Sequence, residues 1–558
     1  MSTPQPKSLE DLPITACATR PTSDINTGTW KSVEPRHEDK LPPCSHACPA
    51  GNDISGIILR LASGDLDGAA RLLRSSNPLP ATLGRVCPHF CEGQCNRDAL
   101  GGAIAIHMIE RFLGDLLLSE QTAPQPLPPS GRKVAVVGAG PAGITAAYAL
   151  VLKGHEVEVF DEKPKPGGYL RTGIPDYRLP KEILDREIEL IERLGVKFNR
   201  GVRIGRDIRF EDLSSRFDAV IVAVGLHEPR AFAVPGSNHR HIYDGVELLE
   251  RILSGETPAL PSAIAVIGGG NTAIDVARSL LRLGATPTIV YRRSETEMPA
   301  IASEVEEAKR EGVGFQFLAA PVAVVTENDA VAGIECRRMQ LGEPDASGRR
   351  TPVPIPGSEF RLPFAGIVVA IGETADLGFL APAAGNGKPS RDGIFFAGDA
   401  STGEGTVAAA VGSGRRIAAL VDSYLHGNAA GDEPTLESLL PRPVNTALVA
   451  GPQYLNPAYF APAPRPGITR LDGEQPPRSF AEIVQGFALD SIVSEARRCL
   501  LCGTCNGCLN CYSWCPDVAV RRDPQGAGFT IDSTHCKGCG ICVEECPRGA
   551  MRLEEVMR

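Results

Sequence analysis

The sequence has no apolar run that approaches the roughly 20 residues needed to cross a bilayer. Its first residues, MSTPQPKSLEDLP, lack the charged and apolar regions of a secretory signal. Basic residues are also fewer than acidic ones: the chain has 57 Lys and Arg and 67 Asp and Glu, so the formal net charge is −10. A surface that binds nucleic acid needs clustered Lys and Arg. We therefore expect a cytoplasmic protein with no membrane span and no nucleic-acid partner.

Cysteine, by contrast, is abundant, with 17 residues in a chain of 558. Nearly all of them stand at metal-ligand spacings and not in a disulfide framework, which is typical of a reducing compartment. The composition, with 42% hydrophobic and 22% charged residues, is that of an ordinary globular protein. The chain is too long for one hydrophobic core, so three or four domains are expected.

The densest cysteine group contains the run C-x-x-C-x-x-C-x-x-x-C-P twice, at 505–516 and 536–547. Bacterial two-cluster ferredoxins have this run, and the fourth cysteine of each copy ligates the other cluster. The alternative, a pair of structural zinc sites, needs neither the doubled run nor the prolines. We expect two [4Fe–4S] clusters, one on Cys505, Cys508, Cys511 and Cys546 and the other on Cys536, Cys539, Cys542 and Cys515. Cys499 and Cys502 fit neither run and are expected to be spare thiols or to lie outside the ligand shell.

A strand, a glycine loop and a helix are predicted in succession from residue 133. The apolar run KVAVV leads into Gly138, Gly140 and Gly143, and the helical stretch ITAAYALVLKG follows. The first glycine allows a tight turn, the second lets the backbone approach a pyrophosphate, and the third permits close helix packing. The next strand ends at Asp161, at the distance expected for a carboxylate that accepts ribose hydroxyls. This region is therefore predicted to bind a dinucleotide.

The same pattern recurs from residue 263, where AIAVI precedes Gly268, Gly270 and Asn271 and the strand PTIVY follows the helix. Here Arg292 and Arg293 stand where the first pattern has its acid. A guanidinium at that place suits a 2′-phosphate, so NADP(H) is favoured over NAD(H). The alternative is that both arginines are solvated charges after a strand end.

Two nucleotide sites in one chain indicate a flavin paired with a nicotinamide, because a flavin accepts hydride and releases electrons singly to iron–sulfur clusters. The segment GIFFAGDA, at 393–400, is expected to be a strand followed by Gly398 and Asp399. The next helix would begin near Thr406 and Val407, with its N-terminus close to a flavin ring or its phosphates. A simple turn with an acid is the alternative. Since the cofactors carry the hydride chemistry, no catalytic side chain is predicted.

A second cysteine group lies nearer the N-terminus, at Cys44, Cys48, Cys87, Cys91 and Cys95. Thiolates four residues apart can converge on one cluster, and helices would close the gap of about 38 residues between the two halves. The fourth ligand of a three-thiolate site is either another cysteine or a carboxylate, for which Glu110 is well placed. The alternative is a helical domain with buried reduced cysteines. Cys17 and Cys336 stand alone and are expected to be inert.

Residues from about 40 to 425 resemble the small (beta) subunit of NADPH-dependent glutamate synthase and its wider family of electron-input flavoproteins, here fused to a bacterial-type ferredoxin. The resemblance rests on NPLPATLGRVCPHFCEGQC, VAVVGAGPAGITAAYAL, PGGYLRTGIPDYRLP, VIGGGNTAIDVAR, VYRRSETEMPA and FFAGDASTGEGTV. It implies FAD contacts at Gly138, Gly140, Gly143, Asp161, Gly168, Leu170, Arg178, Asp399, Thr406 and Val407. It implies NADPH contacts at Gly270, Asn271, Thr272, Asp275, Arg292 and Arg293.

One departure from the family bears on the clusters. Members with two N-terminal clusters carry a further C-x-x-C just upstream of the position of Cys44, and this chain has RHEDKLPP there. The resemblance therefore implies one N-terminal [4Fe–4S] cluster, on Cys48, Cys87 and Cys91 with Glu110. Cys44 and Cys95 would be remnants, or substitutes for the carboxylate.

The expected fold is multidomain α/β: an N-terminal α-helical iron–sulfur domain, two Rossmann-like domains for FAD and NAD(P)H, and a C-terminal α+β ferredoxin-like domain. The predicted boundaries are 1–130 for the helical domain, 131–255 and 361–430 for FAD, 256–360 for NAD(P)H, 431–480 for a proline-rich linker, and 481–558 for the ferredoxin. The linker is either a semi-rigid tether or an arm that lies along a surface and binds another subunit.

These features predict an NAD(P)H:acceptor oxidoreductase that serves as the electron-input subunit of a hetero-oligomer. Its partner would be a 2-oxoacid:ferredoxin oxidoreductase, a sulfite-reductase-type enzyme or a glutamate synthase large subunit. The ferredoxin part weighs against glutamate as the product, because that small subunit needs no such tail. The alternatives are a stand-alone NADPH:ferredoxin oxidoreductase and a non-catalytic iron–sulfur scaffold.

Overall fold

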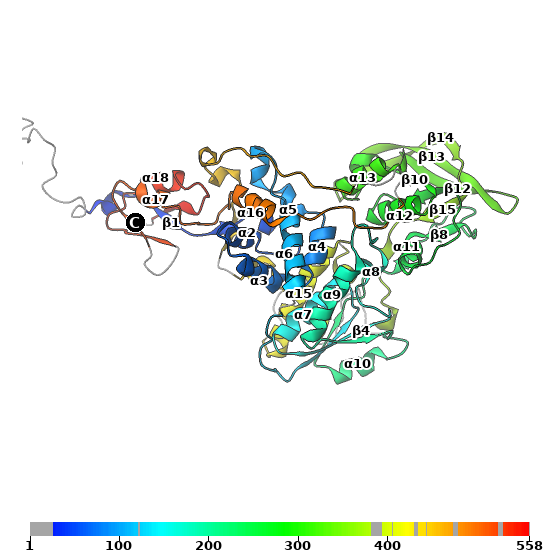
Figure 1. The fold of residues 1–558 in the computed structure, drawn as a ribbon, viewed down its shortest axis with the longest axis horizontal. Coiled ribbons are helices and arrows are strands. Elements are labelled where there is room, and N and C mark those ends of the chain that lie inside the picture. The colour runs from blue at the N-terminus through cyan, green and yellow to red at the C-terminus, as the bar shows by residue number, and fades with distance from the viewer. Residues whose placement is uncertain are drawn as a thin grey trace, which may run out of the picture.

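The computed structural model describes residues 26–120, 123–380, 393–403, 405–428, 433–441, 444–471, 478–522 and 528–556, so that Cys17 lies outside the described residues. Three parts follow one another along the long axis of the molecule (Figure 1). The ferredoxin part is at one end, the helical part is in the middle, and the two α/β domains form the other end. Among the described residues, no helix has both the length and the hydropathy of a membrane-crossing segment.

The first α/β domain has a parallel sheet of five strands in the order β17-β6-β3-β4-β5. The strands are β3 (Lys133–Val137), β4 (Glu156–Asp161), β5 (Lys197–Arg200), β6 (Ala219–Val222) and β17 (Ile394–Phe396). Its helices are α7 (Pro141–Leu152), α8 (Tyr169–Thr172), α9 (Lys181–Arg193), α10 (Phe210–Arg216), α14 (Asp399–Thr402) and α15 (Val407–Leu425). Helix α7 is apolar on nearly every side and is buried between the sheet and α15, as its alanine-rich sequence predicts.

The second α/β domain has another parallel sheet of five strands, in the order β11-β10-β9-β15-β8. Its strands are β8 (Ile242–Asp244), β9 (Ala263–Ile267), β10 (Thr286–Tyr291), β11 (Gly314–Phe317) and β15 (Gly366–Val369), and its helices are α11 (Gly245–Leu253), α12 (Asn271–Arg282) and α13 (Ala302–Glu311). An antiparallel sheet of β12 (Ala319–Glu327), β13 (Ala330–Pro344) and β14 (Arg350–Leu362) packs beside it, and β7 (Glu228–Pro229) pairs with β16 (Glu373–Thr374). The main sheet therefore takes β8 and β15 from outside the predicted 256–360, because short strands are recruited by long-range pairing that no local pattern reveals.

The middle part consists of α1 (Pro43–His46), α2 (Ile54–Ala62), α3 (Leu66–Ser76), α4 (Pro80–Val86), α5 (Phe90–Gly93) and α6 (Ile106–Glu120). Asp53 and Asp65 cap α2 and α3 by accepting the backbone N–H groups of Gly56 and Gly68, as expected for N-cap aspartates. The ferredoxin part contains α17 (Asn510–Ser513), α18 (Ile541–Glu544), β21 (Met551–Glu555) and a hairpin of β19 (Val520–Arg522) and β20 (Phe529–Ile531).

The two ends of the chain exchange elements between the ferredoxin part and the helical part. Strand β1 (Val33–His37), from the predicted helical domain, pairs antiparallel with β21 of the ferredoxin part. Helix α16 (Leu489–Arg498), from the predicted ferredoxin domain, packs against α2 and α6 (Figure 1). Its fully buried Glu495 accepts the backbone N–H of Ala105 at 2.7 Å. The ferredoxin part therefore contains β1 from the predicted helical domain, and the helical part contains α16 from the predicted ferredoxin domain.

The proline-rich segment lies along its own chain and is not a free tether. Strand β18 (Asn445–Val449) pairs with β2 (Lys40–Leu41) in parallel. Farther on, Ala463 N–H donates to the Leu100 carbonyl at 3.0 Å and Arg465 N–H donates to the Gly101 carbonyl at 2.8 Å. Between these two contacts, Asn456 N–H donates to the Pro547 carbonyl of the ferredoxin part at 3.2 Å. The described part of this segment thus contacts both the helical part and the ferredoxin part.

Candidate cofactor sites

The first glycine loop has the geometry that a dinucleotide requires. Gly138 has a φ of 106°, and a Cβ there would lie 2.4 Å from the Ala223 carbonyl oxygen, so only glycine fits this turn. A Cβ on Gly143 would lie 2.0 Å from the Gly138 carbonyl oxygen, which explains how the helix packs so close to the loop. Around Gly140, by contrast, there is open space toward a ligand.

A cavity of about 520 Å³ opens in front of this loop, between the two α/β domains. Of the residues that the resemblance assigns to FAD, it is lined by Gly138, Gly140, Asp161, Gly168, Leu170, Arg178, Asp399, Thr406 and Val407. From the NADPH set it is lined by Asn271, Thr272 and Asp275. The structure therefore brings both predicted nucleotide sites to one cavity, which is the arrangement that transfer between two cofactors needs.

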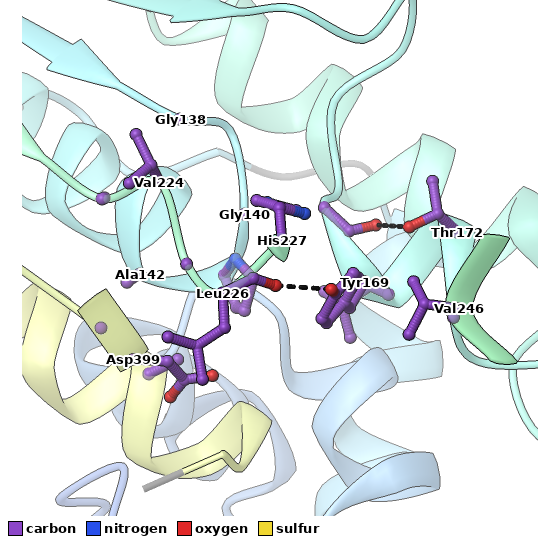
Figure 2. A pocket seen from close by; sticks show the side chains of 18 of the residues that line it. Gly138, Gly140, Ala142, Tyr169, Thr172, Val224, Leu226, His227, Val246 and Asp399 are labelled. Carbon is purple, nitrogen blue, oxygen red and sulfur yellow. Dashed lines mark hydrogen bonds between the residues drawn. The ribbon is translucent and has the colours of Figure 1, made fainter. Parts of the chain in front are cut away.

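The cavity walls are held in place by hydrogen bonds between separate segments. Figure 2 shows the Tyr169 hydroxyl donating to the Leu226 carbonyl, with Asp399 reaching the same space from α14. Asp161 accepts the backbone N–H groups of Ala139 at 2.6 Å and Lys163 at 2.8 Å. Burial raises the pKa of Asp161, which those two hydrogen bonds only partly offset. The carboxylate thus ties the glycine loop to the end of β4.

An ion pair that the sequence did not predict joins the two halves of the cavity. Arg178, assigned to FAD, donates to Asp275, assigned to NADPH, at 2.7 Å, and both side chains are buried. Burial opposes the charge of Arg178, but Asp275 and Glu304 outweigh it and hold its pKa above the ordinary value. Tyr177 adds a second link, because the Arg282 guanidinium lies 3.9 Å from the centre of its ring. No local pattern in the sequence signals these contacts, because Arg178 and Asp275 lie 97 residues apart.

The two arginines after β10 have different surroundings. Arg293 is buried and donates to Asp345 at 2.7 Å and to the Arg350 carbonyl at 2.8 Å, so its guanidinium is occupied by the antiparallel sheet. Arg292 is exposed at the end of the strand. Arg292 is therefore the residue for which the predicted 2′-phosphate contact is retained, and neither residue lines the cavity between the domains.

The N-terminal residues predicted to hold a cluster line a second, smaller cavity. Cys48, Cys87, Cys91 and Glu110 all face it. Glu110 accepts the side-chain amides of Asn77 at 2.8 Å and Asn52 at 3.1 Å, while burial raises its pKa to about 7. Three thiols and a positioned carboxylate on one cavity fit the donor set of a [4Fe–4S] cluster.

A thin wall separates this thiol site from the large cavity. Val86 and Pro88, on either side of Cys87, line the large cavity, whereas Cys87 itself lines the small one. Likewise Val407 of α15 faces the large cavity and its neighbour Ala408 faces the small one. Adjacent residues therefore contact both sites, which places a bound dinucleotide next to the thiols.

The C-terminal cysteines come together in the two sets that the ferredoxin run predicts. Burial raises the pKa of Cys511, and the nearby sulfurs of Cys546, Cys505 and Cys508 raise it further. In the second set the same holds for Cys542, with Cys515, Cys536 and Cys539 as its first neighbours. The exchange of the fourth cysteine between the runs is thus present in the fold.

Comparison with known proteins agrees with these sites. The profile of the pyridine nucleotide-disulphide oxidoreductases matches residues 132–414. The profile of dihydropyrimidine dehydrogenase domain II, 4Fe-4S cluster, matches residues 38–122, and that of the 4Fe-4S binding domain matches residues 529–552. The chain belongs to the pyridine nucleotide-disulphide oxidoreductase family.

Several relatives of this oxidoreductase are subunits of larger enzymes by name. The beta subunit of NADP(+)-dependent formate dehydrogenase from Moorella thermoacetica is 38% identical, over 82% of this chain and 70% of its own length. The beta subunit of NADPH-Fe(3+) oxidoreductase from Geobacter sulfurreducens is 36% identical, over 82% of this chain and 75% of its own. The small chain of NADPH glutamate synthase from Escherichia coli is 33% identical, over 69% and 89%.

The predicted family, fold class and cofactors are confirmed by these matches. This oxidoreductase is an FAD- and iron–sulfur-dependent enzyme that uses NADPH, which excludes the non-catalytic scaffold. The individual contact residues remain predictions, supported by the cavity that they line.

Proposed function

We propose that this oxidoreductase is the electron-input subunit of a hetero-oligomeric redox enzyme. It takes electrons from NADPH at the cavity between the α/β domains and delivers them through the C-terminal clusters to a partner subunit. The proposal rests on one observation above others. The ferredoxin part, which lies at the end of the molecule opposite the two α/β domains (Figure 1), exposes both apolar side chains and cluster cysteines.

The residues around the nucleotide cavity bind and orient the two dinucleotides. Gly138 and Gly268 shape the loops, Asp161 anchors the first loop, and Arg292 is the candidate for the 2′-phosphate. When bound, the flavin accepts a hydride and releases electrons singly to iron–sulfur centres. The wall formed by Val86, Pro88 and α15 keeps that reaction space next to the N-terminal thiols.

Electrons would leave the subunit at the surface of the ferredoxin part. Cys508 and Cys539, one from each run, are exposed. Large apolar side chains are exposed around the same runs, at Leu509, Tyr512, Trp514, Val518, Ile541 and Leu553. Exposed apolar patches on a soluble domain mark interaction sites, and aromatic residues contribute most to binding energy there. A partner that covers this surface would bring its acceptor close to the clusters.

The subunit names of the relatives favour a partner of the kind that formate dehydrogenase or NADPH-Fe(3+) oxidoreductase beta subunits serve. Those relatives align over 82% of this chain, whereas the glutamate synthase small chain aligns over 69%. The longer alignment supports a partner of the former kind. The match to the glutamate synthase small chain leaves more of this chain unmatched, so it gives less support to the glutamate synthase large subunit as the partner.

Trp514→Ala tests the exit surface directly. In the native complex, we expect the variant to lose at least tenfold in NADPH-driven reduction of the partner, since central aromatic residues carry interface energy. NADPH-driven reduction of ferricyanide, which needs no docking, should be unchanged. Val353→Ala, at an exposed apolar residue on the distant β14, should leave both reactions unchanged. Equal loss of both activities in the tryptophan variant would overturn the proposal.

The stand-alone NADPH:ferredoxin oxidoreductase is the second candidate, favoured by the same exposed cluster cysteines. The two are separated by the size of the native enzyme. A native activity that migrates as the single 59.1 kDa chain supports the second candidate, and a larger species with additional subunits supports the first.

A further inference from the structure

Besides Cys336, which is buried in β13, four of the described cysteines have no place in the sites described so far: Cys44, Cys95, Cys499 and Cys502. The sequence predicts remnants, or substitutes for the carboxylate, at the first two, and spare thiols or residues outside the ligand shell at the last two. The two pairs stand in separate sequence groups. The exchange of chain ends brings these groups together. Cys499 follows directly on α16, which packs against α2 and α6 of the helical part.

Contacts place all four thiols in one buried region. Cys44, Cys95 and Cys499 pack against the same hydrophobic cluster, which also contains Leu501. The Asn96 side chain, next to Cys95, donates to the Cys502 sulfur at 3.4 Å. Burial raises the pKa of the Cys44 thiol well above its ordinary value, and the nearby sulfurs of Cys499, Cys95 and Cys502 raise it further.

The surroundings provide donors for negatively charged sulfur. The backbone N–H of Leu501 donates to the Cys499 sulfur at 3.3 Å. Arg97 lies near Cys499 and Cys95, is only 3% exposed, and its Nε has no hydrogen-bond partner within the described part of the chain. Arg548 lies near Cys499 and Cys502, and its buried Nε is likewise unpaired among the described residues. Two buried guanidinium Nε atoms without a partner among the described residues, beside four thiols, indicate a missing anion.

We propose that Cys44, Cys95, Cys499 and Cys502 bind a further [4Fe–4S] cluster. Its ligands come from both ends of the chain, since two belong to the helical part and two to the segment that precedes the ferredoxin runs. The C-x-x-C at 499–502 thus takes the place of the pair that is absent upstream of Cys44. This assignment replaces the expectation of remnants and spare thiols, and it holds whichever acceptor takes the electrons.

The position of the site favours a redox cluster over structural zinc. On one side it adjoins the first thiol cavity, because the Cys44 sulfur lies close enough to Cys91 to raise the pKa of that thiol. On the other side Cys502 stands three residues before Cys505, so the two Cα atoms are at most about 11 Å apart. The site therefore lies between the N-terminal and C-terminal clusters and would pass one electron at a time from the first to the second.

Metal analysis of the whole protein, purified without oxygen, tests the assignment. Wild type should contain about 16 irons and as many acid-labile sulfides per chain, with no zinc, because each [4Fe–4S] cluster holds four irons. The double variant C499S/C502S should contain about 12 irons, with FAD unchanged and one reduced-cluster EPR signal lost. C336S, at a buried cysteine of β13 outside all the sites, should keep the wild-type content.

Three results would overturn the proposal: about 12 irons in wild type, about 12 irons together with one zinc, or a double variant that retains the full content. If the double variant does not fold, the wild-type iron and zinc content decides by itself. The variant C44S, which changes a ligand from the other end of the chain, should lose the same EPR signal. The metal content and the EPR signal are measured without a partner subunit. They therefore test the cluster separately from the proposed electron-input role.

Discussion

The two dinucleotide-binding domains share their loop geometry and differ in how they are attached. In both, the first glycine donates its N–H to a carbonyl of the neighbouring strand, Gly138 to Phe160 at 2.8 Å and Gly268 to Val290 at 3.2 Å. The FAD domain packs against the helical part through α15, α9 and α4. The NADPH domain meets the FAD domain through a buried ion pair and Tyr177. The domain predicted to bind FAD thus lies beside the N-terminal thiols, and the domain predicted to bind NADPH is joined to it through buried contacts.

The largest expected effect comes from the first glycine of each loop. A side chain on Gly138 would collide with the Ala223 carbonyl, and one on Gly268 would lie 2.1 Å from the Ala370 carbonyl oxygen. Gly138→Val should give a protein without FAD and without activity. Gly268→Val should keep FAD and its reduction by dithionite but lose NADPH-driven reduction by at least about a hundredfold, which is about 2.7 kcal/mol. Absorbance spectra and stopped-flow reduction measure both. Loss of FAD from both variants would show that the loops do not act separately.

Asp275→Asn tests how the NADPH domain is attached. The change leaves the buried guanidinium of Arg178 with Glu304, 3.4 Å away, as its carboxylate partner among the described residues. The loss of stability should therefore stay below the roughly 3–5 kcal/mol that a fully uncompensated buried charge costs. We expect a lower unfolding midpoint and slower reduction of the flavin by NADPH. Asp207→Asn, in an exposed pair with Arg206 at the surface, should change neither quantity. An unchanged midpoint for the Asp275 variant would mean that other contacts hold the domains together.

The next effect separates the two arginines after β10. Arg292→Ala should raise KM for NADPH about tenfold, a change of about 1.4 kcal/mol, and leave KM for NADH unchanged, because only NADPH carries the 2′-phosphate. Arg293→Ala should instead lower the unfolding midpoint, since Asp345 loses its partner. Steady-state kinetics with both nucleotides provide the measurement. An unchanged preference in the Arg292 variant contradicts the assignment.

The smallest effect concerns the contact between the FAD domain and the helical part. Glu187 of α9 is buried and accepts the Ala81 N–H at 2.7 Å and the Thr82 hydroxyl at 2.6 Å. Burial raises its pKa to about 8, so the folded protein holds this proton more tightly than the unfolded chain. This contribution to stability is complete below the unfolded pKa and is lost as pH rises toward 8.

Relative to Glu187→Gln, wild type should therefore lose a few degrees in unfolding midpoint between pH 6 and pH 8, because its free energy of unfolding falls there by on the order of 1–2 kcal/mol. Thermal unfolding of the two proteins at both pH values provides the comparison. Glu189→Gln, at an exposed residue of the same helix, should show no such trend. A midpoint difference that does not change with pH would mean that Glu187 does not titrate in this range.

Features set by short-range spacing were predictable from the sequence. The glycine loops, Asp161 at the end of β4, and the ferredoxin cysteine runs all lie within about 30 residues, so one local pattern reveals each of them. The ion pair of Arg178 with Asp275, the burial of Arg293, the recruitment of β8 and β15, and the exchange of β1 and α16 were not predictable. Each depends on tertiary packing between distant segments, which overrides local preference.

The exchange of chain ends also sets an order for biosynthesis. Strand β1 leaves the ribosome early, but its partner β21 is translated about 500 residues later, and α16 also follows the helices that it covers. At about 5–20 residues per second, the early segments wait roughly half a minute to nearly two minutes. During that interval the helical part lacks α16, which packs against α2 and α6. We therefore expect the iron–sulfur clusters of the helical part to be inserted after translation ends.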